Sequence, residues 1–197
     1  MKKLFVALLV VMIGGTLGVG IAYAYTHTLL NKWGTSYQTC TFYVQSDFGS
    51  LTKTQFADAV VHWNNQLTKV PPLLYKSSSD TTPVLPSENG IKTVTKAYYG
   101  WTTWVGRTLY WNNASGEVKE VDIELNSYHP FANSKLAGYY DVQSIFTHEL
   151  GHALRVGHST VSSDTMYGSI PTNTDYARTV TTADRDAARA STARWFN

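Results

Sequence analysis

The chain has 197 residues, a length typical of a single domain. Hydrophobic residues make up 43 % of it and charged residues 15 %, which permits a packed core and excludes an intrinsically disordered chain. The formal charge of +2 comes from 16 basic and 14 acidic side chains, and two of the lysines lie within the first three residues. Without these two the charge is balanced (14 − 14 = 0), and no Lys/Arg cluster follows. The sequence therefore argues against a nucleic-acid partner.

The N-terminal residues have the pattern of an export signal. Two lysines precede an apolar run from Leu4 to Ala22, and Ala22-Tyr23-Ala24 has the small-x-small pattern of a signal-peptidase site. We therefore expect residues 1–24 to be a signal peptide and residues 25–197 to form the exported domain. The apolar run is also long enough to span a bilayer, so an uncleaved membrane anchor is the alternative. In both cases the domain is expected outside the cell, either secreted or held at the cell surface.

A strand and a helix are predicted in the first part of the exported domain. In the segment Gln38–Ser46 apolar and polar residues alternate, and this strand contains Cys40, the single cysteine, which we expect to be a small buried hydrophobe. Thr52 and Gln55 then have the spacing of a helix capping box, with Leu51 and Phe56 placed as its hydrophobic staple. Further apolar residues at helical spacing form the predicted buried face: Phe56, Ala59, Val60, Trp63 and Leu67.

The next segment is predicted to be a loop followed by strands. Residues 71–90 hold four of the six prolines, which indicates a surface loop and ends the preceding helix. Strands are expected from Ile91 to Trp111, and again where Val121, Ile123 and Leu125 alternate with acidic residues. A last helix is expected from about Thr182, as its N-cap, to Arg194.

A second helix, with Asp141 as its N-cap, carries the residues of greatest chemical interest. It contains His148 and His152, which lie one turn apart on the same face, so their imidazoles are able to converge on one metal ion. Glu149 stands beside them, where it is able to reach a metal-bound water. This spacing is typical of a zinc site with a neighbouring general base.

A catalytic zinc needs a third protein ligand and one open position. No Glu occurs after Glu149. Asp164 and Asp175 are weaker candidates than His158, which lies ten residues after the first histidine. A continuing helix would place His158 about 280° away from the first histidine, on the wrong face. The chain must therefore leave the helix and turn back, and Gly157 offers the backbone freedom for this.

The segment from His148 to Ser159 resembles the zinc-binding motif of the metzincin metallopeptidases, and most closely that of the matrixins. Asp164-Thr165-Met166-Tyr167 resembles the family's Met-turn, with Met166 eight residues after His158. Weaker likeness is seen in three other segments, namely Phe56–Asn64, Ile123–Asn126 and Thr182–Arg194.

The resemblance implies an α+β fold with a twisted, mostly parallel five-stranded sheet, an antiparallel edge strand and about three helices. It also implies a horizontal active-site cleft between an upper subdomain (25–158) and a small lower subdomain (159–197). Met166 is expected to pack beneath the histidines without ligating the metal. Substrate is expected to pair with a sheet edge within Trp111–Ser127, and the segment from Tyr167 to Tyr176 to line a substrate pocket.

Three departures from the family pattern are visible. Arg155 stands where the family has a glycine, so either the turn is shifted toward Gly157 or Arg155 bears the strain through a local contact. The family's Pro-Arg-Cys-Gly latency segment is not found, so we expect control without a cysteine switch. The structural zinc and calcium loop is not recognisable; calcium is left open, and we assign no metal to His27, His62 or His129.

Together these features predict a monomeric, secreted zinc endopeptidase that acts on protein or peptide substrates. His148, His152 and His158 would hold one catalytic Zn²⁺, and Glu149 would be the general base. Two other readings stay open. One is a zinc hydrolase of cell-wall peptide amides, and the other is a non-catalytic surface-binding module with a structural metal.

Overall fold

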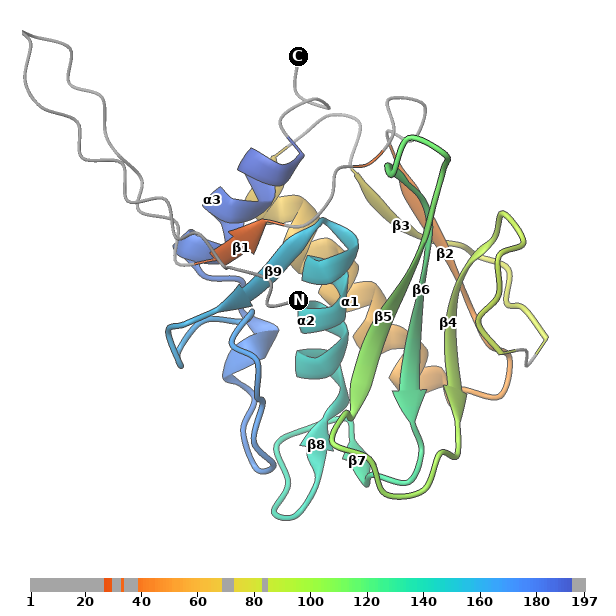
Figure 1. Ribbon diagram of the computed structural model, residues 1–197. Helices are drawn as coiled ribbons and strands as arrows, with labels where there is room; N and C mark the ends of the chain where they lie inside the picture. Colours follow the sequence, from red (N-terminus) through yellow and green to blue (C-terminus); the bar gives the residue numbers. More distant parts are fainter. Residues whose placement is uncertain (1–26, 30–32, 34–38, 69–72, 83–84, 193–197) are drawn as a thin grey trace, which may run out of the picture.

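A five-stranded sheet forms the centre of the molecule (Figure 1). The computed structural model describes residues 27–29, 33, 39–68, 73–82 and 85–192. The strands of the sheet, in their spatial order, are β3 (Leu74–Lys76), β2 (Cys40–Val44), β4 (Lys92–Ala97), β6 (Val118–Asn126) and β5 (Gly106–Asn112). Four of them run parallel, and β5 lies antiparallel to β6 at the edge. The predicted α+β fold with its antiparallel edge strand is therefore confirmed.

Two helices, α1 (Ser50–Leu67) and α2 (Val142–Ala153), pack on one side of this sheet and against each other (Figure 1). Edge-to-face ring contacts continue from the sheet through both helices, with centroid distances of 5.8 Å for Phe42–Phe56 and 5.2 Å for Phe56–Phe146. The fully buried indole of Trp63 donates a hydrogen bond of 2.7 Å to the carbonyl oxygen of Thr147, which joins α1 to α2. The predicted apolar face of α1 is buried.

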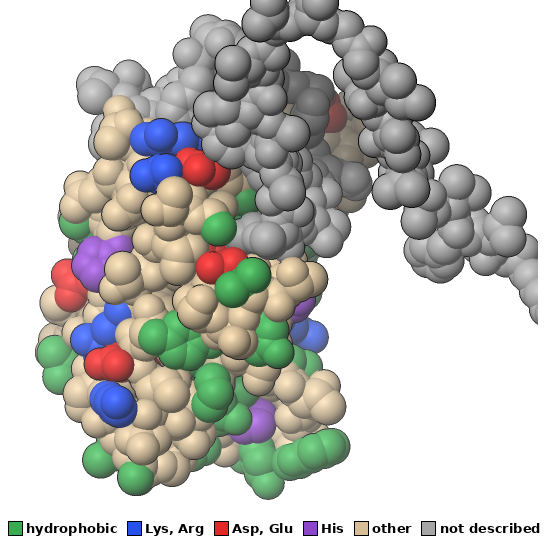
Figure 2. Space-filling view, turned by 90° about the vertical axis from the view of Figure 1, so that its left-hand side faces the viewer, with side chains coloured by type: hydrophobic (Ala, Val, Ile, Leu, Met, Phe, Trp, Pro, Cys, Tyr) green, Lys and Arg blue, Asp and Glu red, His purple; other side chains and the backbone are tan. Residues whose placement is uncertain are grey.

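The smaller elements lie on the side of the helices that faces away from the sheet and at the start of α2. β1 (His27–Leu29) pairs antiparallel with β9 (Val156–Ser159), and β7 (Phe131–Ala132) pairs parallel with β8 (Tyr140–Asp141). α3 (Thr182–Ser191) contacts α1, β1 and β9, and a short 3₁₀ turn, η1 (Tyr176–Arg178), precedes it. In Figure 2 hydrophobic side chains gather in the lower part of the face formed by these segments, and its described residues form no continuous basic surface.

The N-terminal predictions lie outside the described residues, because the description begins at residue 27. The expected signal peptide, residues 1–24, therefore stays a prediction, as does its alternative as a membrane anchor. Within the described part of the chain, no helix combines the length and apolar character that a bilayer crossing requires.

The predicted start of α1 is wrong by three residues. Its N-cap is Gly49, no side chain caps it, and Thr52 lies within the first turn. The hydroxyl of Thr52 donates instead to Asn133 Oδ1 at 3.1 Å, and Leu51 is 57 % exposed, so neither the capping box nor the staple forms. By contrast, α3 has a true capping box between Thr181 and Asp184, one residue before the predicted cap at Thr182. The predicted N-cap of α2, Asp141, is confirmed.

Two predictions about strands also need correction. The segment predicted as a loop, residues 71–90, contains the strand β3. This strand pairs with β2, and its short, partly polar sequence gave no sign of the pairing. The predicted substrate edge, Trp111–Ser127, is mostly β6, and β6 is an inner strand between β4 and β5. The edge strand on this side is β5. Cys40 is fully buried in β2, as expected, and burial raises the pKa of its thiol to about 12.

β6 presents a row of buried polar side chains on the face of the sheet opposite the helices: Glu120, Asp122, Glu124 and Asn126. Asp122 accepts hydrogen bonds from the backbone N–H groups of Thr93 (2.6 Å) and Ser87 (3.2 Å), and Glu120 accepts from Asn89 and Gly90. Glu124 pairs with Arg107 at 2.7 Å. The alternating pattern was predicted, but Glu120 and Asp122 are covered by the segment Ser87–Gly90, whose backbone N–H groups they satisfy.

The exit from α2 depends on the backbone of Arg155. This residue has φ = 72°, in the left-handed region, whereas Gly157 is not among the positive-φ residues. Arg155 therefore makes the turn for which the resemblance implies a glycine, at a cost of about 1–2 kcal/mol. Its guanidinium lies over the ring of Tyr110, 4.0 Å from the centroid, a cation–π contact that offsets part of this strain. Of the two alternatives drawn from the sequence, the strained Arg155 is the correct one.

The Arg155 turn gives a first prediction. Arg155→Gly removes both the strain and the ring contact, whereas Arg155→Ala keeps the strain and loses the contact. We expect the alanine variant to be less stable than the glycine variant by about 1–2 kcal/mol in the free energy of unfolding. Urea denaturation of both proteins measures this difference. Equal stabilities would show that the left-handed backbone is not a significant cost.

Asp122 gives a prediction about pH. Burial raises the pKa of its carboxyl to about 6, so the folded protein holds this proton more tightly than the unfolded chain does. The stability that Asp122 contributes is therefore greatest at low pH and falls as the pH rises from about 4 to about 6. Relative to Asp122→Asn, the wild type should lose about 2–3 kcal/mol of unfolding free energy between pH 4 and pH 7. A difference that stays constant with pH would contradict this.

Candidate metal centre and active site

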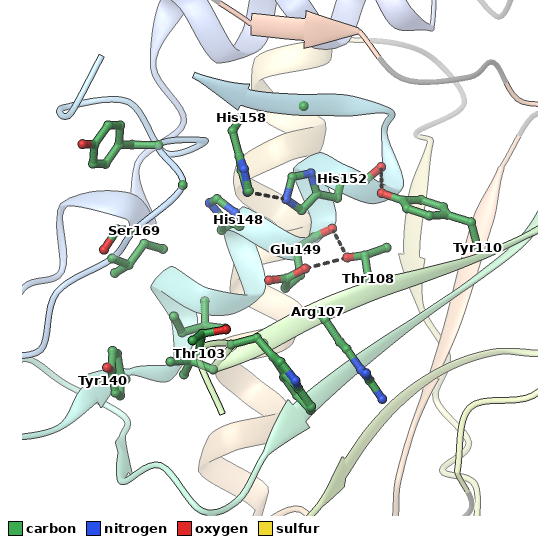
Figure 3. Close-up of a pocket in the computed structure, with 18 residues that line it drawn as sticks. Thr103, Arg107, Thr108, Tyr110, Tyr140, His148, Glu149, His152, His158 and Ser169 are labelled. Carbon is green, nitrogen blue, oxygen red and sulfur yellow. Dashed lines mark hydrogen bonds between the residues drawn. The ribbon is translucent and has the colours of Figure 1, made fainter. Parts of the chain in front are cut away.

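Three histidines from two neighbouring elements converge at the open side of α2 (Figure 3). His148 and His152 lie on α2, and His158 comes from β9, which follows the Arg155 turn. One ligand atom from each residue lies within 4.8 Å of the other two, and the Nε2 atoms of His152 and His158 are 3.2 Å apart. Two nitrogens bound tetrahedrally to one zinc ion stand about 3.3 Å apart. The cluster therefore fits a zinc ion, and among the described residues it is the one such group found.

Backbone carbonyls orient two of these rings. His148 Nδ1 is 2.8 Å from the carbonyl oxygen of Thr165, and His152 Nδ1 is 2.7 Å from that of Val156. A carbonyl accepts a hydrogen bond, so Nδ1 carries the proton in each ring and Nε2 keeps its lone pair. This is the tautomer that a metal-binding imidazole needs, and the carbonyl holds the ring in the required direction.

The surroundings of the rings favour their neutral, metal-binding form. Burial lowers the pKa of His148 to about 4, and it also lowers the pKa of His152 well below the usual histidine value. The pKa of His158 is lowered for the same reason, although this ring is the most exposed of the three. Around neutral pH these shifts favour the uncharged form of the three imidazoles in the absence of a metal.

Glu149 lies beside the histidines and is 5 % exposed. Burial raises the pKa of its carboxyl to about 7, and a hydrogen bond from Thr108 opposes this shift. The Oγ1 atom of Thr108 is 2.7 Å from Glu149 Oε2 and 3.0 Å from the main-chain oxygen of the same residue. Figure 3 shows the other carboxylate oxygen pointing away from Thr108. The carboxyl is thus close to the metal cluster without being part of it.

Met166 is fully buried and its side chain lies against Gly151 of α2. A Cβ on Gly151 would stand 2.2 Å from Met166 Sδ and 2.9 Å from Trp63 Cζ2, so no side chain fits at this point of α2. The backbone oxygen of Met166 accepts from the N–H of Ser159 at 2.8 Å. Met166 therefore contacts α2 through its side chain and β9 through its backbone oxygen.

The Met-turn is fastened to α3 by two buried aspartates. Asp184 accepts hydrogen bonds from the backbone N–H groups of Thr165 (2.9 Å) and Met166 (3.3 Å) and also takes part in the α3 capping box. Asp164 accepts from the hydroxyls of Ser159 (2.5 Å) and Thr181 (3.2 Å). The sequence contains no sign of this connection between Asp184 and the Met-turn.

A cavity of about 640 Å³ surrounds the histidines and Glu149. One wall comes from β5, and the opposite wall comes from the segment after Met166, which includes Tyr167 and Ile170. Tyr167, predicted for a substrate pocket, therefore lines the cavity. Tyr176 does not, and its hydroxyl donates to the Ser169 oxygen at 3.3 Å.

Four residues of β5 that were not predicted as site residues line the cavity: Gly106, Arg107, Thr108 and Tyr110. Gly106, Thr108 and Tyr110 alternate along the strand and so share one face, but the sequence contains no sign that this face would meet α2. Two other histidines, His62 and His129, lie elsewhere: His62 Nδ1 is 2.6 Å from the Arg178 oxygen, and the His129 ring contacts Tyr128 and Tyr140.

Comparison with known proteins agrees with this geometry. No curated protein sequence matches the chain significantly. The family model of the matrixins, however, matches residues 36–191, which is most of the chain and includes all elements of the sheet, the three helices and the histidine cluster. The resemblance inferred from the zinc motif and the Met-turn is confirmed by this match. The chain belongs to the matrixin family, whose members are zinc metallopeptidases.

Proposed function

We propose that this matrixin is a secreted zinc endopeptidase that cleaves extended protein or peptide substrates. The observation that carries the proposal is the buried Glu149 carboxyl beside three converging, neutral imidazoles within an open cavity. A zinc site that only stabilises a fold usually has four protein ligands and has no need of an adjacent base. In the described chain the cluster offers three nitrogen donors, which leaves a position for water or substrate.

His148, His152 and His158 would hold the catalytic zinc. Their donor type, their lowered pKa values and the carbonyl partners of two Nδ1 atoms fit this metal. When bound, zinc would act as a Lewis acid that brings the pKa of a coordinated water to about 7 and polarises the substrate carbonyl. We assign no residue to calcium.

Glu149 would carry the proton during hydrolysis. Its carboxylate accepts a proton from the attacking water as the water oxygen bonds to the scissile carbonyl carbon. The same carboxyl then donates this proton to the departing amine nitrogen as the C–N bond breaks. Burial among apolar neighbours keeps the proton affinity of Glu149 high enough for the first transfer and low enough for the second.

The free edge of β5 is the proposed place for the substrate backbone. In the described chain β5 pairs with β6 on one side only, and residues of β5 line the cavity. An extended peptide is able to add to such an edge by backbone hydrogen bonds. The apolar side chains of Tyr167 and Ile170 on the opposite wall favour a hydrophobic residue next to the cleaved bond.

Location, assembly and domain boundaries are part of the proposal. Residues 1–24 would direct export and be removed, and residues 25–197 would act outside the cell as a monomer, divided at His158 into an upper and a lower subdomain. If the N-terminal segment is retained instead, the enzyme would be held at the cell surface. A zinc hydrolase of cell-wall peptide amides would use the same centre, and a binding module would not need Glu149.

The first test is cleavage of a mixed library of end-blocked peptides by residues 25–197. We expect internal cleavage by the wild type, with Glu149→Ala reducing kcat at least 100-fold because the proton carrier is lost. Mass spectrometry of the products locates the cleaved bonds. Both proteins should contain one zinc per chain, and Glu88→Ala, on an exposed loop, serves as the matched control.

The outcomes separate the rival functions. Cleavage of cell-wall cross-bridge peptides with none of library peptides would favour the cell-wall hydrolase. The absence of hydrolysis of either substrate, with zinc bound and the fold intact, would favour the binding module and contradict the proposed enzyme.

Removal of the metal gives a second test. A ligand that binds only the folded state at 100 times its dissociation constant adds about 2.7 kcal/mol to the free energy of unfolding. We expect a chelator to remove this stabilisation and added zinc to restore it, as followed by thermal unfolding. His158→Ala should abolish most of the zinc effect, whereas His62→Ala, on α1 outside the cluster, should retain it. A zinc effect that survives in His158→Ala would remove this residue from the ligand set.

A further inference from the structure

The edge strand β5 packs unusually closely against α2 through alternate residues (Figure 3). A Cβ on Gly106 would lie 2.7 Å from Ile145 Cγ2 and 3.1 Å from Glu149 Oε1. Two residues further along β5, Thr108 contacts Glu149, and after two more the hydroxyl of Tyr110 donates to the His152 oxygen at 3.2 Å. One face of β5 thus follows α2 from its middle to its last turn, and the absence of a side chain at Gly106 permits this approach.

Thr108 is the residue of this face that contacts the general base. Its Oγ1 is 2.7 Å from Glu149 Oε2, and in the described chain no other group hydrogen-bonds this carboxyl. The main-chain oxygen of Glu149, 3.0 Å from the same Oγ1, gives the hydroxyl a second contact with the same residue. The hydroxyl therefore links the side chain of Glu149 to its own backbone. Because Thr108 is β-branched and lies in a strand, its side chain has few rotamers available.

We propose that Thr108 is a positioning residue that fixes the Glu149 carboxyl in the orientation required for proton transfer. The inference rests on the role of Glu149 proposed above. With Oε2 held by Thr108, rotation of the carboxyl group is restricted, and Oε1 lies on the side away from Thr108, next to Gly106, where both residues line the cavity and the strand carries no side chain. Oε1 is then the oxygen that takes the proton from water and returns it to the amine.

The hydrogen bond of Thr108 persists through this proton transfer. Before the transfer the hydroxyl donates to Oε2 of the carboxylate. After Oε1 has accepted the proton, Oε2 becomes the carbonyl oxygen of the acid and still accepts from the hydroxyl. No group has to move when the proton arrives or leaves. Restriction of the base in one geometry lowers the barrier without affecting how the substrate backbone binds to the strand edge.

The test compares Thr108→Val with Thr108→Ser in the zinc-loaded protein. Valine keeps the shape and branching of threonine but has no hydroxyl, whereas serine keeps the hydroxyl. We expect Thr108→Val to lower kcat on the order of 10-fold with KM within about twofold of wild type, and Thr108→Ser to restore most of kcat. Thr95→Val is the matched control, because Thr95 is a buried threonine on β4 whose hydroxyl donates to the Ile123 oxygen at 3.4 Å, away from Glu149. Its kcat should be unchanged.

A second measurement separates positioning from a purely structural role. Glu149→Asp shortens the base by one methylene, so the contact with Thr108 is lost and Thr108→Val should cause no further decrease in that background. An equal decrease in both backgrounds, an unchanged kcat in Thr108→Val, or a failure of serine to rescue would each overturn the proposal. If the valine variant does not fold, Thr108→Ala gives the same comparison.

Crystal structures of the zinc-loaded proteins provide a readout that does not depend on activity. We expect a single Glu149 rotamer in the wild type and Thr108→Ser, and more than one in Thr108→Val. This result keeps the two proposals apart. A wild type that cleaves no peptide would reject the endopeptidase, while an ordered Glu149 in Thr108→Val would reject the positioning role of Thr108.

Discussion

The convergence of three imidazoles on one point is the constraint on which the rest of this structure depends. Two of them come from α2, where helical spacing brings them together, but His158 must be returned from the end of that helix. This return needs a left-handed residue at Arg155, a strand that runs back beside the helix, and a Met-turn beneath both. Each of these features costs conformational freedom, and buried hydrogen bonds to Asp164 and Asp184 hold them in place.

The edge strand connects this metal centre to the proposed chemistry. β5 is the last strand of the sheet, so within the described residues one of its edges is free for a substrate while one face contacts α2. The same strand therefore aligns the general base from one side and would align the scissile peptide from the other. Burial at this junction lowers the pKa values of the histidines and raises that of Glu149, so that the ligands stay neutral and the base stays moderately basic.

The predictions that agree with the structure concern features set by residues close together in the sequence, and the wrong ones concern features set by distant residues. The strand of Cys40, the buried face around Trp63 and the Asp141 cap were predicted because they depend on neighbours in the chain, whereas the sequence left the turn open between Arg155 and Gly157. The predicted N-cap of α1 was wrong because the hydroxyl of Thr52 donates a hydrogen bond to Asn133, 81 residues away. β3 was missed because its pairing with β2, not its own composition, makes it a strand.

The sequence by itself indicated the proposed metal ligands, the proposed base and the Met-turn segment, because all lie within 19 consecutive residues, from His148 to Met166, whose spacing is set by helix geometry and chain length. Only the tertiary structure decided which groups surround them. Thr108 reaches Glu149 across 41 positions, and Asp122 is buried by a loop instead of facing water. Such contacts depend on the packing of whole elements, and local periodicity carries no information about which strand lies beside which helix.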